Sequence, residues 1–216
     1  FILFDKEYGL YENHEILGEK GHFITSPLVS KHFSHCIAKH YIKESTFDTI
    51  VELGGGDASL ACDLLFYLND KKELPNKYIF YEKSDYLIKK QKSIISEKSI
   101  SKLVDISWVS DLKDLPNEAF IISNELFDCI PTDIIMHVPG GYQKAYINDD
   151  YKLDWKKLNF KSDSAFTDLG LPKNLPNNYI FEYSYAQRDI INEISGVLHR
   201  ACFLIFDYGY TSSELY

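Results

Sequence analysis

The feature that most constrains the fold is a glycine-rich stretch between a short apolar run and a helix-like pattern. Residues 49–60 read T-I-V-E-L-G-G-G-D-A-S-L. The run Asp48–Leu53 predicts a buried strand, and the leucine spacing within Ser59–Leu68 predicts a helix. A strand, a glycine loop and a helix in this order are typical of an open α/β sheet, where the loop after the first strand binds ligands.

The same alternation continues along the chain. Further strands are predicted at Tyr78–Tyr81, Ile106–Val109, Ala119–Ile122 and Cys202–Phe206, and helices after Ser84 and at Tyr185–Arg200. Between about 132 and 182 the helical pattern disappears, and Pro-Gly-Gly (139–141) and Asn-Asp-Asp (148–150) predict hairpins. We therefore expect an α/β protein with a doubly wound, mainly parallel sheet and an antiparallel insertion around 132–182.

An N-terminal segment, residues 1–45, is predicted to cap the main domain, residues 46–216. Ser26 can cap a helix with Pro27 at its first position. Apolar residues then follow at helical spacing from Val29 to His40, with Cys36 on the apolar face.

Composition excludes several classes of protein. The net charge is −9 and the pI is about 5.2, which disfavours a nucleic-acid partner. No apolar run reaches the roughly 18–20 residues of a membrane span. The four cysteines form no C-x-x-C pair, so we expect reduced core thiols in an intracellular protein, and no metal site. The sequence does not indicate an oligomeric state.

The glycine loop leaves three ligand hypotheses open. Gly54-x-Gly56 fits the start of a dinucleotide fingerprint, but Ser59 stands where the third glycine belongs. Glu52 precedes the loop in the pattern E-x-G-x-G, which is typical of S-adenosylmethionine (SAM) sites, and its charge would repel a pyrophosphate. Glu82, at the end of the second strand, can accept hydrogen bonds from ribose hydroxyls in either kind of site. The third hypothesis is a plain glycine turn.

Polar residues also follow the fourth strand, in I-I-S-N-E-L-F-D-C-I-P (residues 121–131). Asn124, Glu125 and Asp128 are expected to emerge beside the glycine loop, where a carboxylate could hold a guanidinium in a bidentate pair. The alternative interpretation is a capped turn before Pro131.

Five segments occur in one order along the chain: F-I-T-S-P (23–27), V-E-L-G-G-G-D-A-S-L (51–60), Y-E-K-S-D-Y-L-I-K-K-Q (81–91), S-N-E-L-F-D-C-I-P (123–131) and F-D-Y-G-Y (206–210). On these segments the chain resembles the MidA-like family of SAM-dependent methyltransferases over essentially its whole length. The resemblance implies a Rossmann-like class I methyltransferase fold and SAM as the cofactor. Mitochondrial members methylate an arginine of a respiratory complex I subunit and are needed for that complex to assemble, so a protein substrate is implied.

The resemblance carries over to residues that match the family's motifs. The expected catalytic residues are Asn124, Glu125 and Asp128. The expected cofactor-binding residues are Glu52, Gly54, Gly55, Gly56, Glu82 and Ser123. The segment expected to cover the cofactor, together with the end of the fifth strand, contributes Phe23, Thr25, Ser26, Pro27, Asp207 and Tyr208.

The chain also departs from the family pattern. Ala58 replaces the last loop glycine, which we expect to be tolerated only at negative φ. His22 and Leu28 replace two acids, and we expect the family's final antiparallel strands, which follow D-Y-G-Y, to be missing from this chain.

The leading functional hypothesis is a SAM-dependent protein arginine methyltransferase. A non-catalytic assembly factor that retains the fold is the second hypothesis, and a nicotinamide-dependent oxidoreductase is the third. The expected location is the cytoplasm for a bacterial source and the mitochondrial matrix for a eukaryotic one, with the bacterial cytoplasm favoured.

Overall fold

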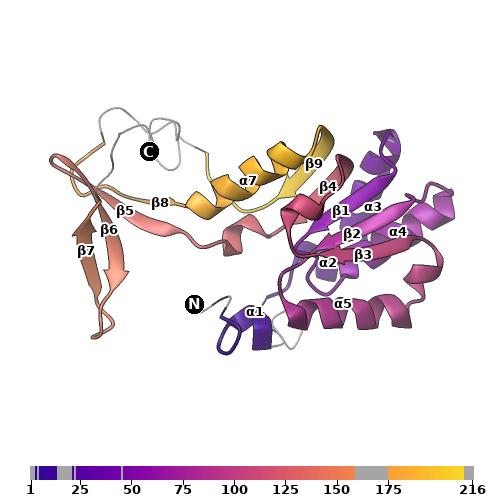
Figure 1. Cartoon of the computed structure of the whole chain (residues 1–216), viewed down its shortest axis with the longest axis horizontal. Helices are drawn as coiled ribbons and strands as arrows, with labels where there is room; N and C mark the ends of the chain where they lie inside the picture. Colours follow the sequence, from indigo (N-terminus) through magenta and orange to yellow (C-terminus); the bar gives the residue numbers. More distant parts are fainter. Residues whose placement is uncertain are drawn as a thin grey trace. The chain divides into compact units, whose positions relative to one another are not determined.

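A computed structural model describes residues 3, 5–13, 21, 23–44, 46–158 and 175–211 (Figure 1). The helices are α1 (Leu10–Asn13), α2 (Ser26–Val29), α3 (Lys31–Lys43), α4 (Ser59–Lys71), α5 (Asp85–Glu97) and α7 (Tyr185–Val197), with short 3-10 helices η1 (Ile100–Lys102), η2 (Leu112–Asp114) and η3 (Phe127–Cys129). The strands are β1 (Thr49–Leu53), β2 (Lys77–Tyr81), β3 (Asp105–Val109), β4 (Glu118–Asn124), β5 (Asp133–Val138), β6 (Gly141–Ile147), β7 (Leu153–Lys157), β8 (Ile180–Tyr183) and β9 (Arg200–Phe206). The chain divides into two compact units, one holding residues up to Cys129 with Ile190–Tyr208, the other holding Ile130–Asp189.

The first unit is built on a five-stranded sheet in the order β3-β2-β1-β4-β9. All four strand pairs are parallel. The chain moves from β1 outward through β2 to β3 and then returns to β4 on the other side of β1. The strand order therefore reverses between β1 and β4, which is where open α/β sheets bind their ligands.

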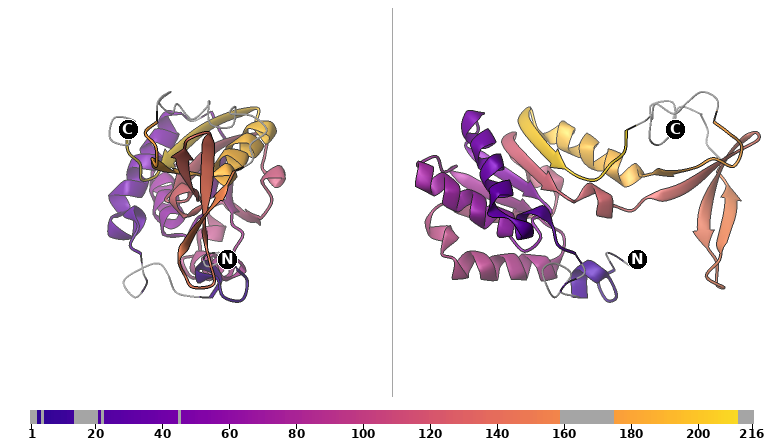
Figure 2. Two further views of the ribbon diagram at one scale, coloured as in Figure 1. Left: turned by 90° about the vertical axis from the view of Figure 1, so that its left-hand side faces the viewer. Right: turned by 180° about the vertical axis from the view of Figure 1, so that it is seen from behind.

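Two hydrophobic cores cover the two faces of this sheet. One joins Phe80 and Phe120 with apolar residues of α3, α4 and α5, and the other joins Val51 and Ile121 with Ile194 of α7. Helices α3 and α4 pack side by side (Figure 2). Strand residues alternate between the two cores, as side chains in a pleated sheet must. The expected doubly wound sheet, with helices on both faces, is confirmed.

The N-terminal helix differs from the prediction of one continuous helix. It is broken at Ser30, whose backbone is extended (φ −158°, ψ 127°), and the Ser30 side chain accepts a hydrogen bond from the His32 N–H. Serine competes with the helix for backbone donors in this way, so it starts a new helix instead of continuing the old one. Thr25, not Ser26, is the N-cap of α2. The proposed boundary of a cap segment at residue 45 stays a prediction.

The second unit contains the expected antiparallel insertion. Its sheet has the order β7-β6-β5-β8, with all pairs antiparallel. Gly140 and Gly141 have φ of +84° and +146°, which allows the tight turn predicted from Pro-Gly-Gly. A small core of Ile135, Phe181 and Tyr183 lies on one face of this sheet.

The cysteine prediction is only partly right. All four cysteines are free, but only Cys62 is buried, and Cys36 is exposed. The apolar stripe of α3 runs through Ile37, Ala38 and Tyr41, which leaves Cys36 outside it.

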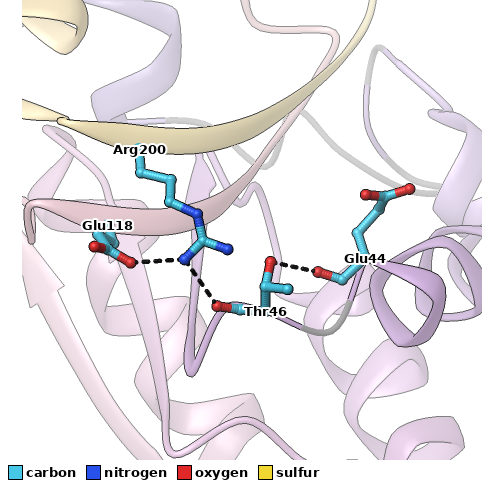
Figure 3. Close-up of polar contacts among 4 residues, drawn as sticks. All are labelled: Glu44, Thr46, Glu118 and Arg200. Carbon is cyan, nitrogen blue, oxygen red and sulfur yellow. Dashed lines mark hydrogen bonds and ion pairs between the residues drawn. The ribbon is translucent and has the colours of Figure 1, made fainter.

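An ion pair lies where β4 and β9 begin. Arg200 contacts the Glu118 carboxylate at 2.9 Å and donates to the Thr46 carbonyl at 3.3 Å (Figure 3). Both charged side chains are about half exposed, so the pair contributes at most about 1 kcal/mol. It lies at the amino ends of the strands, away from the carboxyl ends where a ligand would bind.

Candidate functional site

The glycine loop turns directly out of β1 into α4. Gly54 has φ +69°, and its N–H donates to the Tyr81 carbonyl at 3.0 Å. A Cβ added to Gly54 would lie 2.9 Å from Leu126, and one added to Gly55 would lie 2.6 Å from the Phe80 ring. Gly55 therefore excludes a side chain because the Phe80 ring fills the space, whereas Gly54 disfavours one mainly through its left-handed backbone, since the tip of Leu126 can move aside. Gly56 also has positive φ, at +51°.

Ala58 contradicts the expectation of a negative φ. It has φ +66° and ψ 14° and is fully buried at the start of α4. The left-handed conformation costs a non-glycine residue about 1–2 kcal/mol. The Ala58 N–H donates to the Gly55 carbonyl at 2.8 Å, and its own carbonyl accepts from Cys62, so the turn holds the alanine in this conformation. The loop thus keeps a glycine-like backbone without the family's last glycine.

Glu52 lies beneath the loop. Its side chain is 3% exposed, and its Oε2 accepts a hydrogen bond from the Tyr78 hydroxyl at 2.7 Å. Burial raises the Glu52 pKa to about 7, against the lowering effect of the Tyr78 bond, and the nearby carboxylates of Asp57 and Glu82 raise it further. Since the Glu52 side chain is enclosed, any contact with a ligand would pass through the loop backbone.

Glu82 ends β2 as expected and is 8% exposed. Its Oε1 accepts from the N–H groups of Lys83 and Ser84 at 2.9 and 3.1 Å, and its Oε2 accepts from Gln91 at 3.2 Å. Burial raises its pKa, and the three hydrogen bonds oppose that shift. A carboxylate offers about four acceptor positions, so the free capacity lies mainly on Oε2.

The sequence analysis missed one buried group beside this acid. Gln91 of α5 is fully buried and donates to both Glu82 and the Gly56 carbonyl. Its own carbonyl accepts from the Trp108 indole at 2.8 Å. The available signal was a polar residue on the apolar stripe of a helix, which needs hydrogen-bond partners when it is buried.

The segment after β4 lies against the glycine loop through the contact between Leu126 and Gly54. The Ser123 hydroxyl is buried and has no hydrogen-bond partner among the described residues. Glu125 has φ +50°, an uncommon conformation for this residue type, and its N–H donates to the Phe206 carbonyl at 2.8 Å. Its Oε1 accepts from Ser26 N–H at 3.3 Å and from Asn124 Nδ2 at 3.4 Å.

Asp207 and Asp128 have different surroundings. Both Asp207 oxygens accept backbone hydrogen bonds, from Phe127 at 2.7 Å and from Tyr208 at 2.9 Å. Asp128 is exposed, and its pKa is raised first by partial burial and then by the charges of Asp207 and Glu125. Glu125, Asp128 and Asp207 thus form one negatively charged cluster. Within it, Asp207 fixes the backbone at Phe127 and Tyr208 through its two hydrogen bonds.

The N-terminal segment contacts this cluster. Ser26 reaches Glu125 through its backbone, Pro27 is buried, and Phe23 is about half exposed. Tyr208, fully exposed, has its pKa raised mainly by the Glu125 charge. Thr25 caps α2 without a side-chain hydrogen bond. His22 lies outside the described residues, and Leu28 is half-buried.

The expected cofactor and catalytic residues thus gather at one edge of the first unit, and their individual roles stay predictions. Among the described residues, no group of three or more histidine, cysteine or acidic side chains could hold a metal ion. The described helices include none that is long and apolar enough for a membrane crossing.

A parallel sheet of this order, a glycine loop at its switch point and an acid at the end of β2 are typical of α/β domains that bind an adenosine ligand, a class that includes the class I methyltransferases. Residues 36–216 match the model of the family described as "Putative S-adenosyl-L-methionine-dependent methyltransferase", and the chain belongs to this family. The expected family resemblance and the expected cofactor, SAM, are confirmed.

Curated relatives carry a more specific name. The "Protein arginine methyltransferase NDUFAF7, mitochondrial" of Rattus norvegicus is 28% identical over 176 residues, covering 69% of this chain and 40% of the relative. The Homo sapiens protein of the same name is 29% identical over 186 residues, covering 74% of this chain and 42% of the relative. The chain therefore spans less than half the length of these relatives.

Solved structures support the fold. A Burkholderia thailandensis protein bound to S-adenosyl-homocysteine superposes with a TM-score of 0.81 at 20% identity, covering 99% of this chain and 57% of the other. A native structure from the same organism gives a TM-score of 0.72 at 21% identity, covering 88% of this chain and 52% of the other. At these identities the likeness shows the fold alone.

Proposed function

We propose that the protein transfers a methyl group from SAM to a guanidinium nitrogen of an arginine in a partner protein. The observation that carries this proposal is the packing of Leu126 on Gly54, because it joins the acidic segment after β4 to the cofactor loop. Carboxylates beside the cofactor suit a cationic acceptor better than a neutral or anionic one.

The residues of the site fit SAM. Glu82 presents a buried carboxylate with free acceptor capacity at the end of β2, as a ribose requires. The Ser123 hydroxyl is buried without a partner among the described residues and is available for a polar ligand atom. The carboxylates of Asp57 and Glu82 favour a cationic ligand over a pyrophosphate.

The chemistry assigns distinct tasks to the acids. Bound SAM supplies an electrophilic methyl group on sulfur, and the S–C bond to this methyl group breaks to leave S-adenosyl-homocysteine. Glu125 and Asp128 hold the guanidinium and orient one nitrogen, and a carboxylate of this pair accepts the proton that this nitrogen loses as its new N–C bond forms. Burial and neighbouring acids raise the pKa of Asp128, which makes this carboxylate a better proton acceptor than an ordinary aspartate. Asp207 holds the backbone of Phe127 and thereby orients Asp128.

The relatives support arginine as the acceptor and a protein as the substrate, since their printed names describe protein arginine methyltransferases of mitochondria. From the resemblance to the MidA-like family, and not from these printed names, we propose a respiratory complex I subunit as the protein that carries the arginine. We propose the cytoplasm as the location of this activity for a bacterial source, which is favoured, and the mitochondrial matrix for a eukaryotic one.

A second candidate is an assembly factor that binds SAM without transferring its methyl group, suggested by the substitutions at His22, Leu28 and Ala58. The structure weakens this candidate at Ala58, because the loop keeps positive φ there. A nicotinamide-dependent oxidoreductase is disfavoured by the acids around the loop.

One experiment separates the three functions. The purified protein is titrated calorimetrically with SAM, S-adenosyl-homocysteine and NADH, and is then incubated with labelled SAM and an extract of cells that lack the protein. We expect binding of the first two ligands and mass-spectrometric detection of methylated arginine in one extract protein. Binding without any transfer would favour the assembly factor, and binding of NADH alone would overturn the proposal.

A further inference from the structure

Gln91 occupies a position between the two halves of the cofactor site. It lies on α5, fully buried, two turns after the Ser84 cap. One side-chain amide donates at 3.1 Å to the Gly56 carbonyl in the glycine loop and at 3.2 Å to Glu82 Oε2 at the end of β2. No other described side chain donates to both of these acceptors.

The orientation of the Gln91 amide follows from the chemistry of its partners. The Trp108 indole is only a donor, so the Gln91 atom 2.8 Å from it must be the carbonyl oxygen. Gly56 O and Glu82 Oε2 are only acceptors, so the NH₂ group must face them. Both amide hydrogens and one lone pair are thus used, and the reversed amide would face three mismatched partners.

Aromatic packing holds Trp108, the third hydrogen-bond partner of Gln91, in place. The rings of Trp108 and Phe80 are stacked, with centroids 5.4 Å apart and an interplanar angle of 12°. Phe80 also lies directly under Gly55. The indole that orients Gln91 is therefore held by the same ring that supports the glycine loop.

We infer that Gln91 is a positioning residue that sets Glu82 Oε2 relative to the glycine loop and thereby selects adenosine ligands with an intact 2′,3′-diol. Oε1 of Glu82 is occupied by two backbone N–H groups, so Oε2 is the oxygen with room for a ribose hydroxyl. Gln91 aims this oxygen without adding charge, which preserves the acceptor strength of the carboxylate. The inference rests on the proposed function.

The test compares two ligands on Gln91→Met, which keeps the size of the side chain and removes its hydrogen bonds. S-adenosyl-homocysteine and its 2′,3′-dideoxy analogue are titrated calorimetrically against the protein. We expect the affinity for S-adenosyl-homocysteine to fall roughly tenfold, the effect of losing about one charge-assisted hydrogen bond. The affinity for the dideoxy analogue should change less than about twofold. Ser93→Ala, an exposed position on the same helix, is the matched control and should leave both affinities unchanged.

Two further variants keep the test decisive if Gln91→Met does not fold. Trp108→Phe retains the ring stacking but lacks the indole N–H, and it should show the same ligand selectivity with a smaller loss. Gln91→Glu sets a carboxylate against Glu82, so its affinity for S-adenosyl-homocysteine should recover toward wild type as the pH is lowered and the two carboxyls come to share a proton. The charged groups that act on Glu82 from neighbouring elements are Glu12 and Glu52, which are present in every variant.

If Gln91→Met lowers the affinity for both ligands equally, or for neither, the inference is overturned while the proposed function stands. Failure of the unsubstituted protein to bind S-adenosyl-homocysteine would instead overturn the proposed function, and the inference with it.

Discussion

The Asp207 carboxylate accepts a hydrogen bond from the Phe127 backbone N–H at 2.7 Å. This bond joins the end of β9 to η3, the turn that carries Asp128. The second Asp207 oxygen accepts from Tyr208 N–H at 2.9 Å. Asp207 therefore organises the acidic segment of the site.

Asp207→Asn should lower the free energy of unfolding by about 1–2 kcal/mol, because an amide retains only one acceptor oxygen and no charge. Methyl transfer should slow, while the dissociation constant of S-adenosyl-homocysteine stays within about twofold. Urea denaturation and calorimetry measure the two effects. Asp105→Asn, at an exposed site where β3 begins, is the control, and a stability loss as large in the control would contradict the assignment.

Glu82→Ala should weaken binding of SAM by roughly tenfold or more, because the ribose hydroxyls lose their acceptor. Calorimetric titration measures this change. Glu97→Gln, an exposed change at the other end of α5, should leave the affinity unchanged. An unchanged dissociation constant in Glu82→Ala would refute its role as the ribose acid.

The pH dependence of stability should carry a contribution from Glu52. Burial raises its folded pKa to about 7 from an ordinary 4.5, so between these values the folded protein holds a proton that the unfolded chain releases. The free energy of unfolding therefore falls as pH rises through this window. Glu52→Gln removes the contribution, and its stability relative to wild type should grow by up to a few kcal/mol between about pH 5 and about pH 8. Urea denaturation at several pH values checks this, and a constant difference would exclude the buried acid as its source.

Tyr78→Phe tests the partner of this acid. The Tyr78 hydroxyl lowers the Glu52 pKa through its hydrogen bond, so the variant should raise that pKa further. Its stability should continue to fall above about pH 7, where the wild-type contribution has levelled off. Coincident pH profiles would contradict the hydrogen bond as a determinant of the pKa.

Substitutions at Ala58 separate the effect of backbone strain on stability from the effect of side-chain packing. Ala58→Gly should change the free energy of unfolding by less than about 1 kcal/mol, since relief of the left-handed strain offsets the lost methyl group and the gain in chain entropy. Ala58→Val should cost about 3 kcal/mol, because a β-branched residue at φ +66° in a fully buried site adds strain and overpacking. Thermal denaturation of both variants measures the contrast, and equal effects would show that backbone conformation does not matter there.

Glu125→Gln should reduce methyl transfer by about 100-fold, because the guanidinium loses a charged partner. The affinity for S-adenosyl-homocysteine should change less than about twofold, since the amide oxygen of glutamine can still accept the Ser26 N–H hydrogen bond that holds the N-terminal segment. A labelled-methyl assay and calorimetry separate the two readouts. Glu118→Gln, in the ion pair of Figure 3, is the control for a lost charge and should retain full transfer.

Sequence patterns were sufficient wherever a property depends on residues close together in the chain. The strand before Gly54, the cap at Ser84 and the hairpin at Gly140 and Gly141 all follow from local spacing and turn chemistry, and the structure confirms each of them. Glu82 was also correctly placed at the end of a strand. Because the carboxyl ends of parallel strands meet at one edge of the sheet, this put Glu82 at the edge where ligands bind.

Tertiary contacts decided the rest. Glu52 acquires its raised pKa from burial beside Tyr78, a residue of another strand. Gln91 becomes a link between Gly56 and Glu82 only when α5 packs against the loop. The positive φ of Ala58 depends on the closed turn around it, against its own preference. By itself the sequence determined the order of elements, the family and the set of polar residues at the site, because these follow from local chemistry. Only the tertiary structure decided which of those residues are enclosed, which are paired and which remain free for a ligand, because burial and hydrogen bonding depend on contacts between distant segments.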